Sequence, residues 1–191
     1  MDRDFITVVS GLPRSGTSLM MQMLAAGGLP ALTDAVRTAD ESNPRGYLEF
    51  EKVKQLRADQ SWLEEARGRA VKIIHLLLRE LPTDGRFQYR VVFLKRPLEE
   101  VIASQCAMLA RDGKASADAG ALTKIYSGQL AQVEQWLSAQ SCFATCPVEY
   151  HQLLKNPRAS AEEINAFLDG NLDVAAMSEA VDPSLYRQRT S

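Results

Sequence analysis

A glycine-containing loop near the start of the chain has the residues needed to hold a phosphate-like anion. Gly11 and Gly16 are separated by four residues, which is the glycine spacing of a nucleotide phosphate loop. Glycines let the backbone turn so that several N–H groups point inward, and the N-terminus of the helix that follows favours an anion. Further donors and a positive charge could come from Arg14, Ser15, Thr17 and Ser18.

The loop departs from the nucleotide-triphosphatase pattern at one position. That pattern requires lysine where this chain has Thr17, so the γ-phosphate of a nucleotide would lack its usual cation. Such enzymes also need an acidic residue at a strand end to hold Mg²⁺, and among the predicted strand ends only Glu149 is acidic. We therefore expect an anion site that works without a metal.

The elements that must position this loop alternate along the chain. Apolar, β-branched runs predict strands over 5–10, 71–74, 90–94 and 143–150. Amphipathic or apolar stretches predict helices over 17–26, 49–67, 98–109, 122–137 and 161–168. This alternation predicts one α/β domain over 1–191, with a P-loop-type parallel sheet flanked by helices on both faces. Ligands of such folds lie at the carboxyl ends of the strands.

Composition excludes several classes of protein. Twenty-two Lys and Arg against 24 Asp and Glu give a net charge of −2, which argues against a general nucleic-acid or membrane-surface binder. The three cysteines form no disulfide framework, and we expect structural thiols. No apolar run approaches a membrane span, and residues 1–4 do not resemble a signal peptide. The sequence therefore predicts a cytoplasmic protein.

The stretch from Gly11 to Met20 resembles the phosphosulfate loop of the sulfotransferases that use 3′-phosphoadenosine 5′-phosphosulfate (PAPS). The cytosolic members of that family place lysine at the position of Arg14, whereas tyrosylprotein-type and many bacterial members place arginine there. The resemblance implies that residues 14–18 bind the 5′-phosphosulfate of PAPS. It also implies that no metal takes part.

Two further segments support the resemblance. Family members follow a central strand with arginine and, eight positions later, serine, and both bind the 3′-phosphate; Arg96 and Ser104 match this pattern. A helix beginning at Pro97 would separate the two by about 12 Å of rise. Both can therefore reach one phosphate only if the helix begins near Glu99 or Glu100. The resemblance also implies that Tyr150, after the last predicted strand, lies near the adenine.

Sulfuryl transfer needs a base that takes the proton of the acceptor. His75 resembles the basic histidine of the cytosolic members, and an imidazole titrates near neutral pH. Glu49 resembles the glutamate that tyrosylprotein and heparan members take from the region after the first helix. Both remain candidates, while Arg14 would stabilise the leaving phosphate.

The sequence leaves the acceptor open: a hydroxyl or an amine, on a small molecule or a side chain. Two other functions also remain, a P-loop kinase for a small metabolite and a non-catalytic nucleotide-binding module. We expect no nucleic-acid or membrane partner, and the oligomeric state is not specified. In the basic tail, Arg187 or Arg189 could fold over the nucleotide.

Overall fold

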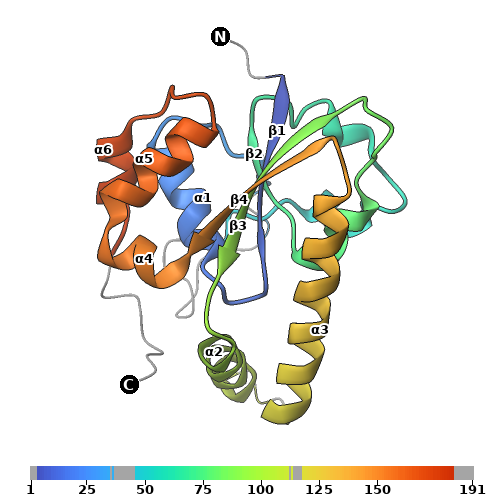
Figure 1. Cartoon of the computed structure of the whole chain (residues 1–191), viewed down its shortest axis with the longest axis vertical. Coiled ribbons are helices and arrows are strands. Elements are labelled where there is room, and N and C mark those ends of the chain that lie inside the picture. The colour runs from blue at the N-terminus through green and yellow to red at the C-terminus, as the bar shows by residue number, and fades with distance from the viewer. Residues whose placement is uncertain (1–3, 35, 37–45, 112, 114–117, 183–191) are drawn as a thin grey trace.

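The computed structural model describes residues 4–34, 36, 46–111, 113 and 118–182. Its centre is a four-stranded sheet in the order β2-β1-β3-β4, and every pairing is parallel (Figure 1). The strands are β1 (Phe5–Gly11), β2 (Ala70–Lys72), β3 (Gln88–Lys95) and β4 (Phe143–Glu149). The predicted α/β fold with a parallel sheet is confirmed.

Successive side chains of each strand enter opposite layers, as the twofold repeat of a strand requires. In β1, Phe5 and Val9 belong to one hydrophobic cluster, whereas Ile6 and Val8 belong to the other. All seven residues of β1 are buried, since a strand covered on both faces has no polar side. This explains why β1 reads as a continuous apolar run.

Helices cover both faces of the sheet (Figure 1). One face packs against α1 (Thr17–Ala26), α4 (Tyr150–Lys155), α5 (Pro157–Phe167) and α6 (Val174–Glu179). The other packs against α3 (Ala119–Ser138) and three short 3₁₀ helices, η1 (Glu51–Gln55), η2 (Ser61–Leu63) and η3 (His75–Glu80). The remaining helix, α2 (Leu98–Arg111), follows β3 beyond the carboxyl edge of the sheet.

The predicted helix over 49–67 is wrong, because this segment forms only η1 and η2. Asp59 explains the break. Its carboxylate accepts hydrogen bonds from the backbone and the hydroxyl of Ser61 at 2.9 and 2.6 Å, and its carbonyl accepts one from the indole of Trp62 at 3.1 Å. Such local bonds compete with a continuous helix.

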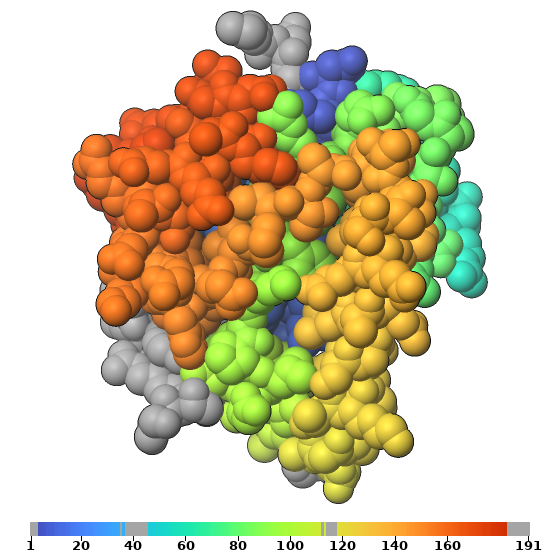
Figure 2. All heavy atoms as spheres, viewed as in Figure 1, coloured from blue at the N-terminus to red at the C-terminus, as the bar shows by residue number. Residues whose placement is uncertain are grey.

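Because the strands are parallel, their carboxyl ends meet at one edge of the sheet. Gly11 and Leu94 are paired there, and a Cβ on Gly11 would lie 2.7 Å from the Leu94 carbonyl oxygen. Glycine thus lets the chain leave β1 against β3. The space-filling view shows atoms of the N-terminal part of the chain, in blue, at the floor of a hollow between α2 and α3 (Figure 2).

Among the described helices, none is long and apolar enough to cross a membrane.

Candidate functional site

A cavity of about 470 Å³ opens at the carboxyl edge of the sheet, within the usual size range of small-molecule sites. The loop after β1, the end of β2, η1, η3, α2 and the start of α4 all contribute to its wall. Its polar wall includes Arg14, Thr17, Ser18, Glu49, Lys54, Lys72, Arg96, Ser104, Arg111, Tyr150 and Asp182.

The loop after β1 turns through two residues with left-handed backbone. Arg14 has a φ of 68° and Gly16 has a φ of 104°; for arginine this conformation is uncommon. Gly16 is also closed in by Tyr150, because a Cβ at Gly16 would lie 2.6 Å from the tyrosine ring. The aromatic ring thus lies against the backbone of the loop at the point where α1 begins.

Arg14 joins the loop to both residues of the second predicted motif. Its Nε donates to the hydroxyl of Ser104 at 3.0 Å, and its carbonyl oxygen accepts from Nη1 of Arg96 at 3.0 Å. Helix α2 begins at Leu98, one residue before the start that we set as the condition for a shared phosphate site. Arg96 and Ser104 nevertheless both contact Arg14, which bridges the gap because its long side chain reaches Ser104, the seventh residue of α2.

Arg96 is held from two more directions. Its Nε donates to Glu100 at 2.8 Å, and its guanidinium lies 4.8 Å from the centroid of the Tyr150 ring. The other carboxylate oxygen of Glu100 lies 2.9 Å from Nε2 of His151. The carboxyl group of Glu100 is only 1% exposed, so Arg96 is fixed by a buried ion pair.

The cavity concentrates positive charge. Burial is the main cause that lowers the pKa of Arg14. The Tyr47 side chain acts in the opposite direction, and the neighbouring charges of Arg111 and Arg96 lower the pKa further. Desolvation and repulsion therefore both oppose a guanidinium here, and a bound anion would relieve the two effects together.

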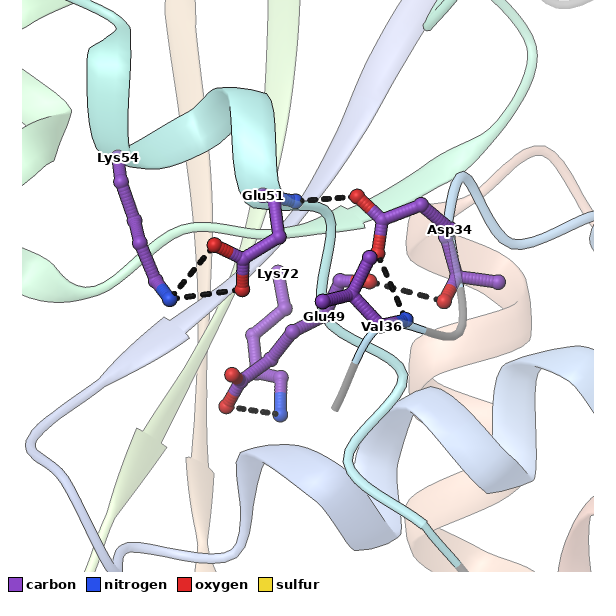
Figure 3. A network of polar contacts seen from close by, with 7 residues as sticks. Asp34, Val36, Glu49, Glu51, Lys54 and Lys72 are labelled. Carbon is purple, nitrogen blue, oxygen red and sulfur yellow. Dashed lines mark hydrogen bonds and ion pairs between the residues drawn. The ribbon is translucent and has the colours of Figure 1, made fainter. Parts of the chain in front are cut away.

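A second polar group stands on the β2 side of the loop. The ammonium of Lys72, which is buried, lies 3.1 Å from the Ser18 hydroxyl. It lies 3.4 Å from the Glu49 carboxylate (Figure 3). It also lies 5.7 Å from the centroid of the Tyr47 ring. Lys72 thus connects the first turn of α1 to Glu49.

The backbone around Glu49 is tied to Thr33 and Asp34, which lie earlier in the chain. The Thr33 hydroxyl donates to the Glu49 carbonyl at 2.9 Å. The two carboxylate oxygens of Asp34 accept from the backbone N–H groups of Glu51, at 2.6 Å, and Val36, at 3.2 Å (Figure 3). These bonds fix the position from which Glu49 enters the cavity.

Two predicted site residues have side chains that do not line this cavity. His75 is 1% exposed, and its Nε2 lies 3.0 Å from the side-chain oxygen of Gln129 in α3. Burial lowers the pKa of His75, while the Gln129 hydrogen bond acts in the opposite direction. The Ser15 hydroxyl is buried beneath the loop and has no hydrogen-bond partner among the described residues.

Sequence reasoning did not assign two residues of this site. Lys72 carried no distinguishing signal, because one lysine in a short strand can face either way. Glu100 could have been found from its charge and its position four residues after Arg96, in the first turn of the predicted helix over 98–109. Among the aromatic residues at this end of the molecule, Tyr47 and Phe50 line the cavity, whereas Trp62 is buried in the core. Arg187 and Arg189 lie outside the described residues.

Two of the three cysteines, Cys142 and Cys146, are buried as structural thiols would be. Burial raises the pKa of Cys142 and raises that of Cys146 to about 11, which disfavours the reactive thiolate. Within the described part of the chain, no group of three or more His, Cys, Asp or Glu residues is placed to hold a metal ion.

Comparison with solved structures identifies the fold. The chain superposes on the sulfotransferase domain of the Synechococcus PCC 7002 olefin synthase with a TM-score of 0.56 and 18% identity, covering 100% of this chain and 90% of that one. The TM-score with a Mycobacterium tuberculosis sulfotransferase is 0.58 at 17% identity, covering 93% and 70% of the two chains. The chain has the sulfotransferase fold.

A mouse sulfotransferase solved in complex with PAP has the same fold at a TM-score of 0.50 and 15% identity, covering 93% of this chain and 63% of the mouse chain. No family model matches the sequence, and no curated protein matches it. The similarity to sulfotransferases is therefore one of fold, detected through structure. It agrees with the resemblance that the sequence motifs indicated, although it does not single out the tyrosylprotein branch.

Proposed function

We propose that this protein is a sulfotransferase that moves a sulfuryl group from PAPS to a hydroxyl acceptor. The observation that carries the proposal is the meeting of Arg14, Arg96 and Ser104 at one cavity. These residues come from two motifs more than 80 positions apart. Their convergence supports a ligand with more than one anionic group, and PAPS is such a ligand.

The order of the strands suggests how PAPS would lie. The loop after β1 would hold the 5′-phosphosulfate through its backbone N–H groups, Thr17 and Ser18, with Arg14 beside them. Arg96 and Ser104, after β3, would hold the 3′-phosphate, and Tyr150, after β4, would contact the adenine. Adjacent strands lie about 4.8 Å apart, so the wall from β2 to β4 spans about 14 Å.

The loop fits an anion of this kind. Gly11 and Gly16 let the loop pack closely against Leu94 and Tyr150, which a Cβ at either position would prevent, and the N-terminus of α1 adds its dipole. When bound, PAPS supplies a sulfuryl group on a phosphate leaving group. Arg14 would stabilise the negative charge that grows on that leaving phosphate. A sulfuryl group carries less charge than a terminal phosphoryl group, so these cations can suffice.

We assign the proton transfer to Glu49. Its carboxylate lines the cavity, is positioned by Lys72, and lies on the β2 side of the loop. There it can take the hydroxyl proton of the substrate while the hydroxyl oxygen attacks the sulfur, in line with the departing phosphate. The positive charge of Lys72 would offset the negative charges of Glu49 and of the transferred sulfuryl group. His75 is a weaker candidate, because its ring is buried, lies against Gln129 of α3 and is not part of the cavity lining.

Calorimetry with PAP, the desulfated product, tests the donor site. We expect PAP to bind without added metal and ATP to bind more weakly. Tight binding of ATP–Mg²⁺ without a response to PAP would overturn the proposal in favour of a kinase. Transfer of ³⁵S-sulfate from PAPS to an alcohol panel then separates an enzyme from a nucleotide-binding module, which would bind PAP without turnover.

A further inference from the structure

We infer that the acceptor is an apolar alcohol, with one hydroxyl on a hydrocarbon body, that lies against the β2 end of the cavity. This inference rests on the proposed function, because it names the substrate class of the same site. It follows from three features of the described residues. The cavity wall at that end is largely apolar, the lysines beside the wall are paired with carboxylates, and the rim of the wall exposes an aliphatic side chain.

The wall at the β2 end is hydrocarbon. Beside Glu49, Lys54 and Lys72, this end of the cavity is lined by apolar residues from the start of η1, from the residues after β2 and from η3. They are Phe50, Val53, Ile73, Ile74 and Leu77. Phe50 is fixed in place by an edge-on contact with Trp62, at 5.5 Å between ring centroids. The hydrocarbon part of an acceptor bound here would displace water and pack against these side chains.

The two lysines at this end already have carboxylate partners. Lys72 lies 3.4 Å from Glu49, and the ammonium of Lys54 contacts both carboxylate oxygens of Glu51, at 2.7 and 2.8 Å (Figure 3). An acidic sugar or an acidic peptide would have to compete with these carboxylates for the lysines. A neutral sugar would leave most of its hydroxyl groups against hydrocarbon, which is costly.

The rim of this wall is also apolar. Ile74 is 43% exposed although it lies directly before η3 and lines the cavity. Its neighbour Leu76 is 47% exposed but is not part of the cavity wall. These two residues provide a matched pair: both are exposed aliphatic side chains two positions apart, and only one would touch the acceptor.

The geometry places the acceptor hydroxyl at Glu49. Glu49 directly precedes Phe50 of the apolar wall, and its partner Lys72 contacts Ser18 at the start of α1, so a molecule lying on the wall would present its hydroxyl toward the bound sulfuryl group. The hydroxyl oxygen forms the new bond to sulfur, its proton passes to Glu49, and the bond from sulfur to the phosphate oxygen breaks. PAP and a sulfate monoester leave.

The test uses PAPS and a series of primary alcohols from butanol to octanol, with 4-alkylphenols as a second arm and glucose as the polar comparison. Each buried methylene contributes about 0.8 kcal/mol, so we expect kcat/KM to rise about fourfold per carbon until the wall is filled. If kcat/KM rises more steeply in the alkylphenol series, the acceptor is an aromatic alcohol. If it rises more steeply in the alkanol series, the acceptor is an aliphatic alcohol. Equal kcat/KM for glucose and octanol would overturn the inference.

The matched variants test the wall directly. We expect Ile74→Asn to lower kcat/KM for octanol at least tenfold and to change PAP affinity less than twofold, whereas Leu76→Asn changes neither. If both variants behave alike, the wall does not bind the acceptor. Saturation-transfer NMR of octanol on the PAP-loaded protein gives a readout without turnover. Failure of PAP binding would instead count against the proposed function, so the two failures are distinguishable.

Discussion

The Arg14 guanidinium donates to the Ser104 hydroxyl at 3.0 Å, across 90 positions of sequence. This bond joins the loop after the first strand to the helix after the third. Because Arg96 also donates to the Arg14 carbonyl, Arg14 is the residue through which the two halves of the proposed donor site are connected.

Removal of the Arg14 side chain should therefore weaken PAP binding strongly. Hydrogen bonds to charged groups contribute about 1.5–3 kcal/mol, so Arg14→Ala should raise the Kd for PAP by about 10- to 150-fold in calorimetry. Arg14→Lys keeps the charge but loses the planar fork, and it should restore binding only in part. Arg158→Ala, at a well-exposed arginine on α5, is the control and should bind PAP normally.

Glu49→Gln should remove turnover while leaving the nucleotide in place. General-base catalysis contributes about 10²- to 10⁴-fold, and we expect kcat to fall by that factor with an unchanged Kd for PAP. Glu51→Gln, two residues away on the surface, is the matched control. A variant His75→Gln that loses turnover while Glu49→Gln retains it would reverse the assignment of the base.

Glu100→Gln should lower both stability and PAP affinity. The carboxylate is buried and paired with Arg96, and breaking such a pair costs about 3 kcal/mol because a charge is left uncompensated. Urea unfolding checks this value. Glu162→Gln removes an Arg–Glu pair of the same i,i+4 spacing on the exposed surface of α5 and should change the unfolding free energy little. Equal losses in the two variants would contradict the role of Glu100.

Gly16→Ala should destabilise the protein more than Gly28→Ala. Both glycines have a left-handed φ, of 104° and 90°, so both substitutions carry a similar backbone cost. Only Gly16 is closed in by a side chain, since the new methyl group would meet the Tyr150 ring, whereas nothing lies within 4 Å at Gly28. The difference between the two unfolding free energies therefore measures the contact between Tyr150 and the loop. No difference would show that the ring moves aside freely.

The buried histidine should make stability depend on pH. Burial lowers the pKa of His75 in the folded state, so the unfolded chain binds more protons below its own value of about 6.5. The contribution of neutral His75 to the free energy of unfolding is complete above that pH, and it is lost as the pH falls toward the pKa of His75 in the folded state. In urea titrations between pH 7.5 and 5, the wild type should lose more unfolding free energy than His75→Gln. Parallel curves would contradict a buried, neutral His75.

Local sequence determined the strands, the glycine loop and the order of the elements, because each is encoded by short apolar runs and turn residues. The runs 5–10 and 90–94 lie within β1 and β3, and the alternation of strands with helices was enough to predict the parallel sheet. The fold needed only these patterns. The segment 49–67 was misjudged because Asp59 breaks it through local hydrogen bonds that an apolar spacing does not reveal.

Only tertiary structure decided which polar residues face the cavity. The direction of a side chain at a strand end depends on what packs around it, so the sequence alone could not separate His75, which turns to Gln129, from Lys72, which turns to Glu49. The same holds for Arg14, whose reach to Ser104 replaces the late helix start that the spacing required. The sequence determines which chemical groups are available, and the packing of the folded chain determines which of them lie together at the cavity.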